Sequence, residues 1–122
     1  MTQEEKDLLL KDLCGRLPYG VKLLHTPTNE ITNLEMIGNG VIDGNIHDLI
    51  ENFKLYLFPM TEEQIEELYD KLIELELKAI NDEISRVEAV EFEIDFYNKH
   101  HLDWRGLIPK GLALDATGLN IY

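Results

Sequence analysis

Apolar side chains recur at steps of three and four residues from position 65 onward, which is the period of a helix with one apolar face. They stand at Ile65, Leu68, Tyr69, Leu72, Ile73 and Ile80. Acidic residues fall largely off this stripe, among them Glu66, Glu67, Asp70 and Glu74. The pattern predicts an amphipathic helix whose solvent side is acidic.

The segment 61–99 is too long for one helix. It would extend about 58 Å, whereas a compact chain of this size is about 35 Å across. Asn81-Asp82-Glu83 is the weakest helical sequence within it. Capping boxes begin a helix on each side of that point, at Thr61 with Gln64 and at Ser85 with Glu88. We therefore predict an αα-hairpin with helices over 62–80 and 86–99.

The second helix of this hairpin also carries a strand pattern. Residues 90–96 alternate between apolar and acidic side chains, which is the period of two that strands show. A helical stripe fits equally well and agrees with the capping box before it; it consists of Val87, Val90, Ile94, Tyr97 and His101. We expect a helix here, while a strand over 89–97 would instead join the sheet described below.

A first helix is predicted from Thr2, which forms a capping box with Glu5. Its apolar stripe consists of Leu9, Leu10, Leu13, Cys14 and Leu17. Gly15 and Pro18 are expected to end it. Cys14 is interpreted as a small buried hydrophobic residue, because no neighbouring base or second cysteine would activate its thiol.

Short apolar runs separated by turn residues follow, and they predict strands. The runs cover 21–25, 31–37 and 41–42, with turns at 27–29, 38–40 and 43–44. They indicate a small antiparallel β-meander of three or four strands, which should lie against the helices because three strands alone are marginally stable. The glycines within 38–44 lack the lysine and the spacing of a phosphate-binding loop, so we interpret them as turn glycines.

The segment 53–58 is densely apolar and is followed by Pro59. We expect it to pass between the sheet and the hairpin as part of the core. Exposed aromatic clusters mark interfaces, so Tyr56 and Phe58 are also candidate partner-binding residues.

The C-terminal segment contains two adjacent histidines and an aspartate, His100, His101 and Asp103. Adjacent residues on a helix point about 100° apart, which suits a metal site poorly. We expect the histidines to close the preceding helix, where the partial negative charge of its C-terminus favours an imidazolium. Side chains expected to fix or pack a turn here are Asp103, Trp104 and Arg105, with Gly106 and Gly111 in unusual backbone conformations.

Charge and composition bound the class of protein. The 122-residue chain has a formal net charge of −13, and the segment 61–99 supplies −9 of it through thirteen acidic and four basic residues. This balance argues against nonspecific binding to nucleic acid or anionic membranes. One cysteine excludes an internal disulfide framework, and the acidic start differs from a signal peptide. We expect one α+β domain over 1–122, in the cytoplasm, with an N-terminal helix, the meander, the acidic hairpin and an irregular C-terminal tail.

Three segments carry a resemblance to a known group of proteins. They are LLLKDLCGRLPYGVK at 8–22, YLFPMTEE at 56–63 and HHLDWRGLIPKGLAL at 100–114. Together they resemble a family of short uncharacterised proteins from gut Bacteroides-type bacteria and their phages or prophages. Because that family has no assigned activity, the resemblance implies a mobile-element setting and supplies no catalytic residues.

The sequence favours function by contact with another protein. We expect the acidic hairpin, through Glu66, Glu67, Asp70 and Glu74, or the aromatic run to bind a protein partner, without a cofactor or metal. One alternative is an acidic mimic of nucleic acid that occupies the binding groove of a basic protein. Another is a small enzyme or metal-binding protein that uses His100, His101 and Asp103, with Glu91 as a base, although no nucleophile motif or cofactor fingerprint accompanies them.

Overall fold

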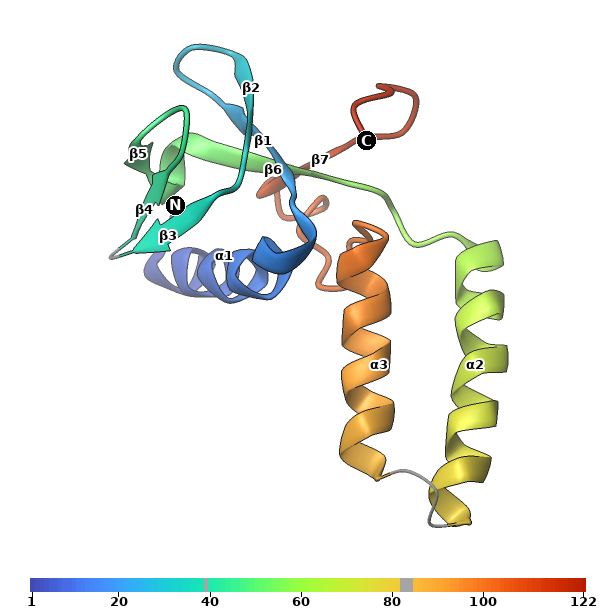
Figure 1. Cartoon of the computed structure of the whole chain (residues 1–122). Coiled ribbons are helices and arrows are strands. Elements are labelled where there is room, and N and C mark those ends of the chain that lie inside the picture. Colours follow the sequence, from blue (N-terminus) through green and yellow to red (C-terminus); the bar gives the residue numbers. More distant parts are fainter. Residues whose placement is uncertain (39, 82–84) are drawn as a thin grey trace.

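The computed structural model describes residues 1–38, 40–81 and 85–122. Its elements are α1 (Gln3–Arg16), β1 (Lys22–His25), β2 (Glu30–Asn33), β3 (Met36–Gly38), β4 (Val41–Asp43), β5 (Asp48–Leu49), β6 (Phe53–Leu57), α2 (Glu62–Ile80), α3 (Arg86–Lys99) and β7 (Ala113–Asp115), with single 3-10 turns at Leu17–Tyr19 and Ile50–Asn52. The expected α+β class is confirmed, with an N-terminal helix, antiparallel strands and two later helices (Figure 1). None of the described helices combines the length and the apolar character that crossing a membrane requires.

The strands form two sheets instead of the single expected meander. One sheet has the order β2-β1-β6-β7, and the other has the order β3-β4-β5. The run 53–58 was expected to pass between the sheet and the hairpin as part of the core. Phe53, Leu55 and Leu57 do belong to the core, but the expected position is wrong, because most of the run is β6, the strand between β1 and β7. Three consecutive residues of β6 are buried, which is typical of a strand covered on both faces. Strand β7 joins it in parallel, so the C-terminal segment is less irregular than expected.

The hydrophobic core lies where α1 crosses beneath the larger sheet (Figure 1). Its buried members are Leu9, Leu13, Val21, Leu23, Leu34, Ile42, Ile50, Phe53, Leu55, Leu57, Leu107, Leu112 and Ala113. Among the described residues of α2 and α3, none belongs to this cluster. We call α1 with both sheets and the segment 101–122 the body, and α2 with α3 the arm.

Helix α1 begins as predicted, because the Thr2 hydroxyl accepts the Glu5 N–H at 3.1 Å and the Glu5 carboxylate accepts the Thr2 N–H at 3.1 Å. Two expectations for this helix are wrong. Cys14 is exposed, because the buried face also includes the charged residues Asp12 and Arg16, which rotate its centre away from Cys14. The helix also continues through Gly15 to Arg16 before the 3-10 turn that contains Pro18.

The predicted αα-hairpin is confirmed, with helices at the expected bounds, and the second segment is a helix. Thr61 and Gln64 form the expected capping box of α2, and the Ser85 hydroxyl accepts the Glu88 N–H at 3.1 Å to begin α3. The predicted break at 81–83 falls mainly on residues 82–84, which lie outside the described residues. The strands were expected to lie against the helices. Helix α1 does pack against them, whereas α2 and α3 run side by side away from the sheets (Figure 1).

Candidate functional site

The arm exposes apolar side chains along both of its helices. On α2 they follow each other mainly at steps of four residues, so they form one stripe. The exposed members are Ile65, Tyr69, Ile73, Leu77 and Ile80, with 45 to 74% of their surface accessible. A shorter exposed stripe on α3 consists of Val87, Val90 and Ile94. Most of the α2 stripe lies off the contact between the two helices, because the half-buried side of α2 is formed by other residues, such as Leu72, Leu75 and Ala79.

A groove between the helices contains one residue of each stripe, Ile80 and Val90. It has a volume of about 450 Å³ and is lined by Leu72, Glu76, Ala79, Ile80, Ala89, Val90 and Glu93. Because Ile80 belongs to the stripe of α2 and Val90 to that of α3, both stripes open on the same side of the arm. Two carboxylates, Glu76 and Glu93, stand among these apolar side chains. We call this side, with the groove and both stripes, the groove face.

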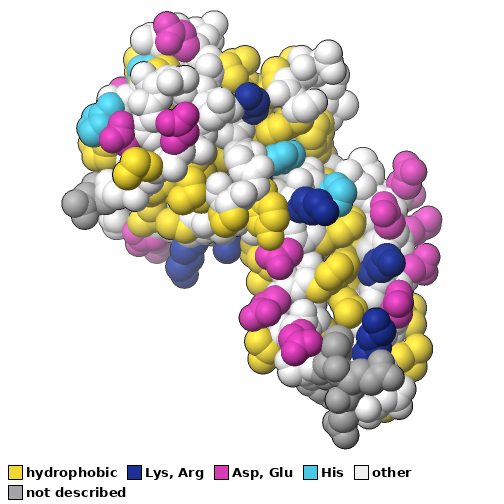
Figure 2. Space-filling view, viewed as in Figure 1, with side chains coloured by type: hydrophobic (Ala, Val, Ile, Leu, Met, Phe, Trp, Pro, Cys, Tyr) yellow, Lys and Arg dark blue, Asp and Glu magenta, His cyan; other side chains and the backbone are white. Residues whose placement is uncertain are grey.

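A separate ridge of acidic residues runs along the outer edge of α2 (Figure 2). The four residues predicted as partner-binding, Glu66, Glu67, Asp70 and Glu74, are all exposed. The two lysines of α2 lie close to this ridge, because Lys71 and Lys78 each approach a Glu74 carboxylate oxygen at 3.9 Å. Exposed pairs at this distance are weak, and they involve only Glu74 among the four acidic residues. The negative charge of the ridge therefore remains largely available for contact with a partner.

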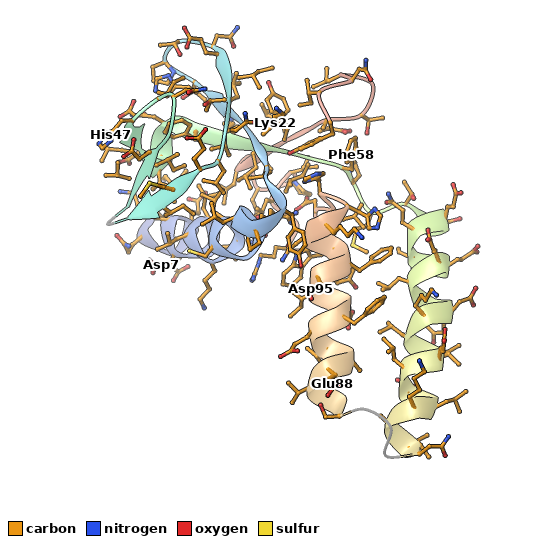
Figure 3. All side chains as sticks on the ribbon, viewed as in Figure 1. Asp7, Lys22, His47, Phe58, Glu88 and Asp95 are labelled. Carbon is orange, nitrogen blue, oxygen red and sulfur yellow. The ribbon has the colours of Figure 1, made fainter. Side chains whose placement is uncertain are left out.

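The base of the arm is tied to the body through α3. The Asn98 side-chain amide donates to the Gly15 carbonyl at 3.2 Å, and its oxygen accepts the Trp104 indole N–H at 3.2 Å. A Cβ atom at Gly15 would lie 3.2 Å from that amide nitrogen, so glycine permits the close approach of α1 to α3. The Tyr97 ring stacks on Trp104 with 5.6 Å between ring centroids. These contacts lie toward the body end of α3, where Asp95 is found, whereas Glu88 lies near the tip (Figure 3).

The two aromatic residues predicted as partner-binding are less accessible than the acidic ones. Tyr56 is buried within β6, and Phe58 is half-buried where the chain leaves that strand for α2 (Figure 3). The ring centroid of Phe58 lies 5.6 Å from that of Tyr122, whose hydroxyl donates to the Tyr56 carbonyl at 2.6 Å. Phe58 therefore packs within the chain, and burial leaves little of the Tyr56 side chain accessible to a partner.

Asp103 and His101, which follow α3, make contacts that hold the turn after this helix in place. Asp103 accepts the backbone N–H groups of Leu107 and Ile108 at 2.7 and 2.9 Å, as expected for a residue that fixes a turn. His101 stacks on Tyr122 with 3.8 Å between ring centroids. The expectation of a charged imidazolium is wrong for His101, because burial, followed by the positive charges of Arg16 and His100, lowers its pKa from 6.5 to about 4. Within the described part of the chain, no three His, Cys, Asp or Glu residues are grouped to hold a metal ion.

A buried charged network beneath this turn was missed by sequence reasoning. Asp12 and Arg16 are both fully buried, and their side chains pair at 2.6 and 3.2 Å. Arg16 also donates to the Leu102 carbonyl at 2.7 Å, while Arg105 Nε lies 3.2 Å from Asp12 without hydrogen-bond geometry. The network therefore joins α1 to the segment after α3. Spacing of four residues within a helix was the available signal, but it is also the spacing of an ordinary surface pair.

His25 forms a second unpredicted arrangement, between the two sheets. Its Nε2 lies 2.8 Å from an Asp48 carboxylate oxygen and its Nδ1 lies 2.7 Å from the Thr28 hydroxyl. The hydrogen bond between His25 and Asp48 lowers the pKa of the Asp48 carboxyl. The order hydroxyl, imidazole, carboxylate resembles that of a hydrolase triad, but neither the groove of the arm nor the hollow beside Tyr122 borders it. Its evident effect is to join β1, the following turn and β5.

Comparisons with family models, with curated proteins and with solved structures find no match to this chain.

Proposed function

We propose that the protein is a non-catalytic protein-binding module whose contact surface is the arm. The observation that supports this most strongly is the distribution of exposed apolar side chains. Of the sixteen large hydrophobic side chains exposed in the described part of the chain, nine belong to the arm. Contiguous apolar surface of this kind marks interaction sites in soluble proteins, whereas isolated exposed residues are ordinary.

The contrast with the rest of the molecule supports the same conclusion. The residues that resemble catalytic groups, Asp103, His101 and His25, are engaged in contacts that fix turns or connect elements. In an enzyme, such groups would converge on a cleft with room for a substrate. The resemblance to proteins of mobile elements makes a phage or host protein the expected partner.

The test is affinity capture from bacterial lysate with the full chain as bait, followed by mass spectrometry. Tyr69→Ser with Ile73→Ser removes exposed apolar surface from the arm. Ile31→Ser with Met36→Ser removes comparable exposed surface from the body and serves as the matched control. We expect the first pair to lose a protein that the wild type and the control retain. Capture of the same proteins by all three chains would contradict the proposal.

A second candidate is supported by the acidic ridge. Exposed carboxylates along α2 could stand in for phosphates and occupy the groove of a basic nucleic-acid-binding protein. Binding of this kind would fall steeply as salt rises and would weaken in Glu67→Gln with Asp70→Asn. Capture that survives high salt and that double substitution would exclude it.

A further inference from the structure

The groove face, on which the proposed function rests, restricts what can cover it. A partner that seals the groove removes Glu76 and Glu93 from water together with the apolar side chains around them. A carboxylate buried without a positive partner is strongly unfavourable. Glu93 is also held in place, because it accepts the Tyr97 hydroxyl at 2.8 Å. The occupant must therefore combine apolar side chains with at least one lysine or arginine that reaches these two carboxylates.

A second copy of the chain does not meet this requirement. Two arms placed groove to groove would bring the same carboxylates together, and each segment 61–99 carries a charge of −9. Lys71 and Lys78 approach Glu74 on the outer ridge, and within the described part of the arm no salt bridge reaches Glu76 or Glu93. Like charges across an interface oppose association.

The shape of the face favours a helix as the occupant. The stripe of α2 from Ile65 to Ile80 extends about 22 Å at 1.5 Å per residue, with the shorter stripe of α3 beside it. The arm consists of helices whose backbone groups are already paired, so it presents no strand edge to an extended peptide. A third helix laid along two packed helices inserts its side chains into the groove between them.

We propose that the groove face binds a basic amphipathic helix of a partner protein, which completes a three-helix bundle with α2 and α3. Its apolar side chains cover Tyr69, Ile73 and Val90, and a lysine or arginine at the border of its apolar face lies between Glu76 and Glu93. About fifteen residues of helix match the length of the α2 stripe.

The probe is a fluorescently labelled 18-residue peptide of leucine, alanine and lysine, acetylated and amidated, with leucines on one helical face and lysines around it. Two control peptides accompany it. One has the same composition in an order that spreads the leucines around the helix, and the other has glutamate in place of every lysine. Fluorescence anisotropy with the full chain gives the dissociation constants. We expect the amphipathic basic peptide to bind about tenfold or more tightly than either control.

Variants of the full chain locate the binding site. Glu76→Gln with Glu93→Gln should weaken the peptide about tenfold, because the buried cation loses its partners. Glu67→Gln with Asp70→Asn changes the net charge equally on the outer ridge and should weaken it less than about threefold. Val90→Ser, at a side chain that is 54% exposed, should also weaken it about tenfold while leaving the circular dichroism spectrum unchanged.

Three results would overturn this inference. The first is equal binding of the amphipathic and reordered peptides, and the second is an equal loss from the groove and ridge substitutions, which would indicate the ridge as the binding surface. The third is self-association of the wild type that Val90→Ser abolishes in sedimentation velocity, which would make a second copy the occupant. The proposed function fails separately, if Tyr69→Ser with Ile73→Ser leaves lysate capture unchanged.

Discussion

The body and the arm each contain a helix with an apolar stripe, yet the two stripes differ in how much of them is covered. In α1, Leu9 and Leu13 have no accessible surface, whereas Ile73 and Leu77 of α2 remain 47 and 56% exposed. The pattern of a helix therefore indicates that one face avoids water, but not which protein covers it. The apolar face of α1 is covered by the sheets of the body, whereas the apolar stripe of α2 remains exposed to solvent.

Anchoring differs between the two regions as well. The body is held by a continuous core and by the buried Asp12–Arg16 pair. The arm has one buried apolar residue in the described part of its helices, Leu68, and one buried polar residue, Asn98. Substitutions of equal chemistry should consequently have very different effects on stability in the two regions.

The largest expected effect comes from Asp12→Ala, which leaves the fully buried Arg16 without its carboxylate partner. Breaking such a pair costs about 3–5 kcal/mol in the free energy of unfolding. The matched control is Lys11→Ala at the adjacent exposed position, which should change stability by less than about 0.5 kcal/mol. Urea denaturation followed by circular dichroism measures both, and a similar small effect of the two would show that the pair does not hold α1 in the body.

The next largest effect on stability is expected from removing a buried leucine of α1 rather than an exposed leucine of α2. Leu13→Ala should cost about 2–5 kcal/mol, because it opens a cavity in the core. Leu77→Ala removes the same atoms from an exposed position and should cost about 0.5 kcal/mol or less. If Leu77→Ala were as destabilising as Leu13→Ala, the arm would be packed against other residues and its apolar stripe would not be free.

The body should also respond to acid through His101, whose pKa in the folded protein is lowered to about 4. Its ordinary pKa is 6.5, so the unfolded chain binds a proton between these values that the folded protein does not. The contribution of His101 to the free energy of unfolding is therefore fully present above about pH 6.5 and is lost as the pH falls toward 4. Asp48 and Asp115 have lowered pKa values, so their losses occur below this window.

Denaturation midpoints between pH 7 and 5 test this expectation. His101→Phe keeps a ring against Tyr122 and removes the titrating group, so its stability should decline less over this range than that of the wild type. An identical decline in both proteins would show that His101 titrates normally in the folded state.

In the arm, Ser85→Ala should weaken the start of α3 by about 1 kcal/mol, because the Glu88 N–H loses its acceptor. Hydrogen exchange of the first turns of α3 should accelerate while β1 and β6 keep their protection. Acceleration in the strands as well would indicate that arm and body open together.

The smallest effect concerns Cys14. Because it is exposed, Cys14→Ser should change stability by less than about 0.5 kcal/mol. A thiol reagent such as DTNB should label the native protein at nearly the rate of the urea-unfolded chain. Strong protection of the thiol would restore the expectation of a buried residue.

The elements governed by local signals were predictable from the sequence. The starts of α2 and α3 follow from Thr61 and Ser85, whose side chains cap the first turn of each helix. The parallel pairing of β6 with β7 joins segments more than fifty residues apart, and no local pattern specifies it. Charged residues are rarely buried, so the apolar stripe alone was used to place the buried face of α1; it omits the buried Asp12 and Arg16 and therefore includes the exposed Cys14.

The candidate site was predicted only in part, because local patterns determine some of it and tertiary packing determines the rest. The acidic ridge is visible in the helical period, since charges off an apolar stripe face water. The groove face depends on how α2 and α3 are rotated against each other and on what the body leaves uncovered. Those facts belong to tertiary packing, so the position of Glu76 and Val90 in the groove could not be predicted from spacing alone.

Residue-resolved hydrogen exchange of the native protein tests most directly whether the arm is an independently anchored, uncovered surface. We expect α2 amides near the tip of the arm to exchange through local openings, with free energies well below that of global unfolding, and β1 and β6 to exchange only when the whole chain unfolds. Addition of the basic amphipathic peptide should slow exchange in the arm and leave the strands unchanged. Equal protection of α2 and β6 in the free protein would contradict the account.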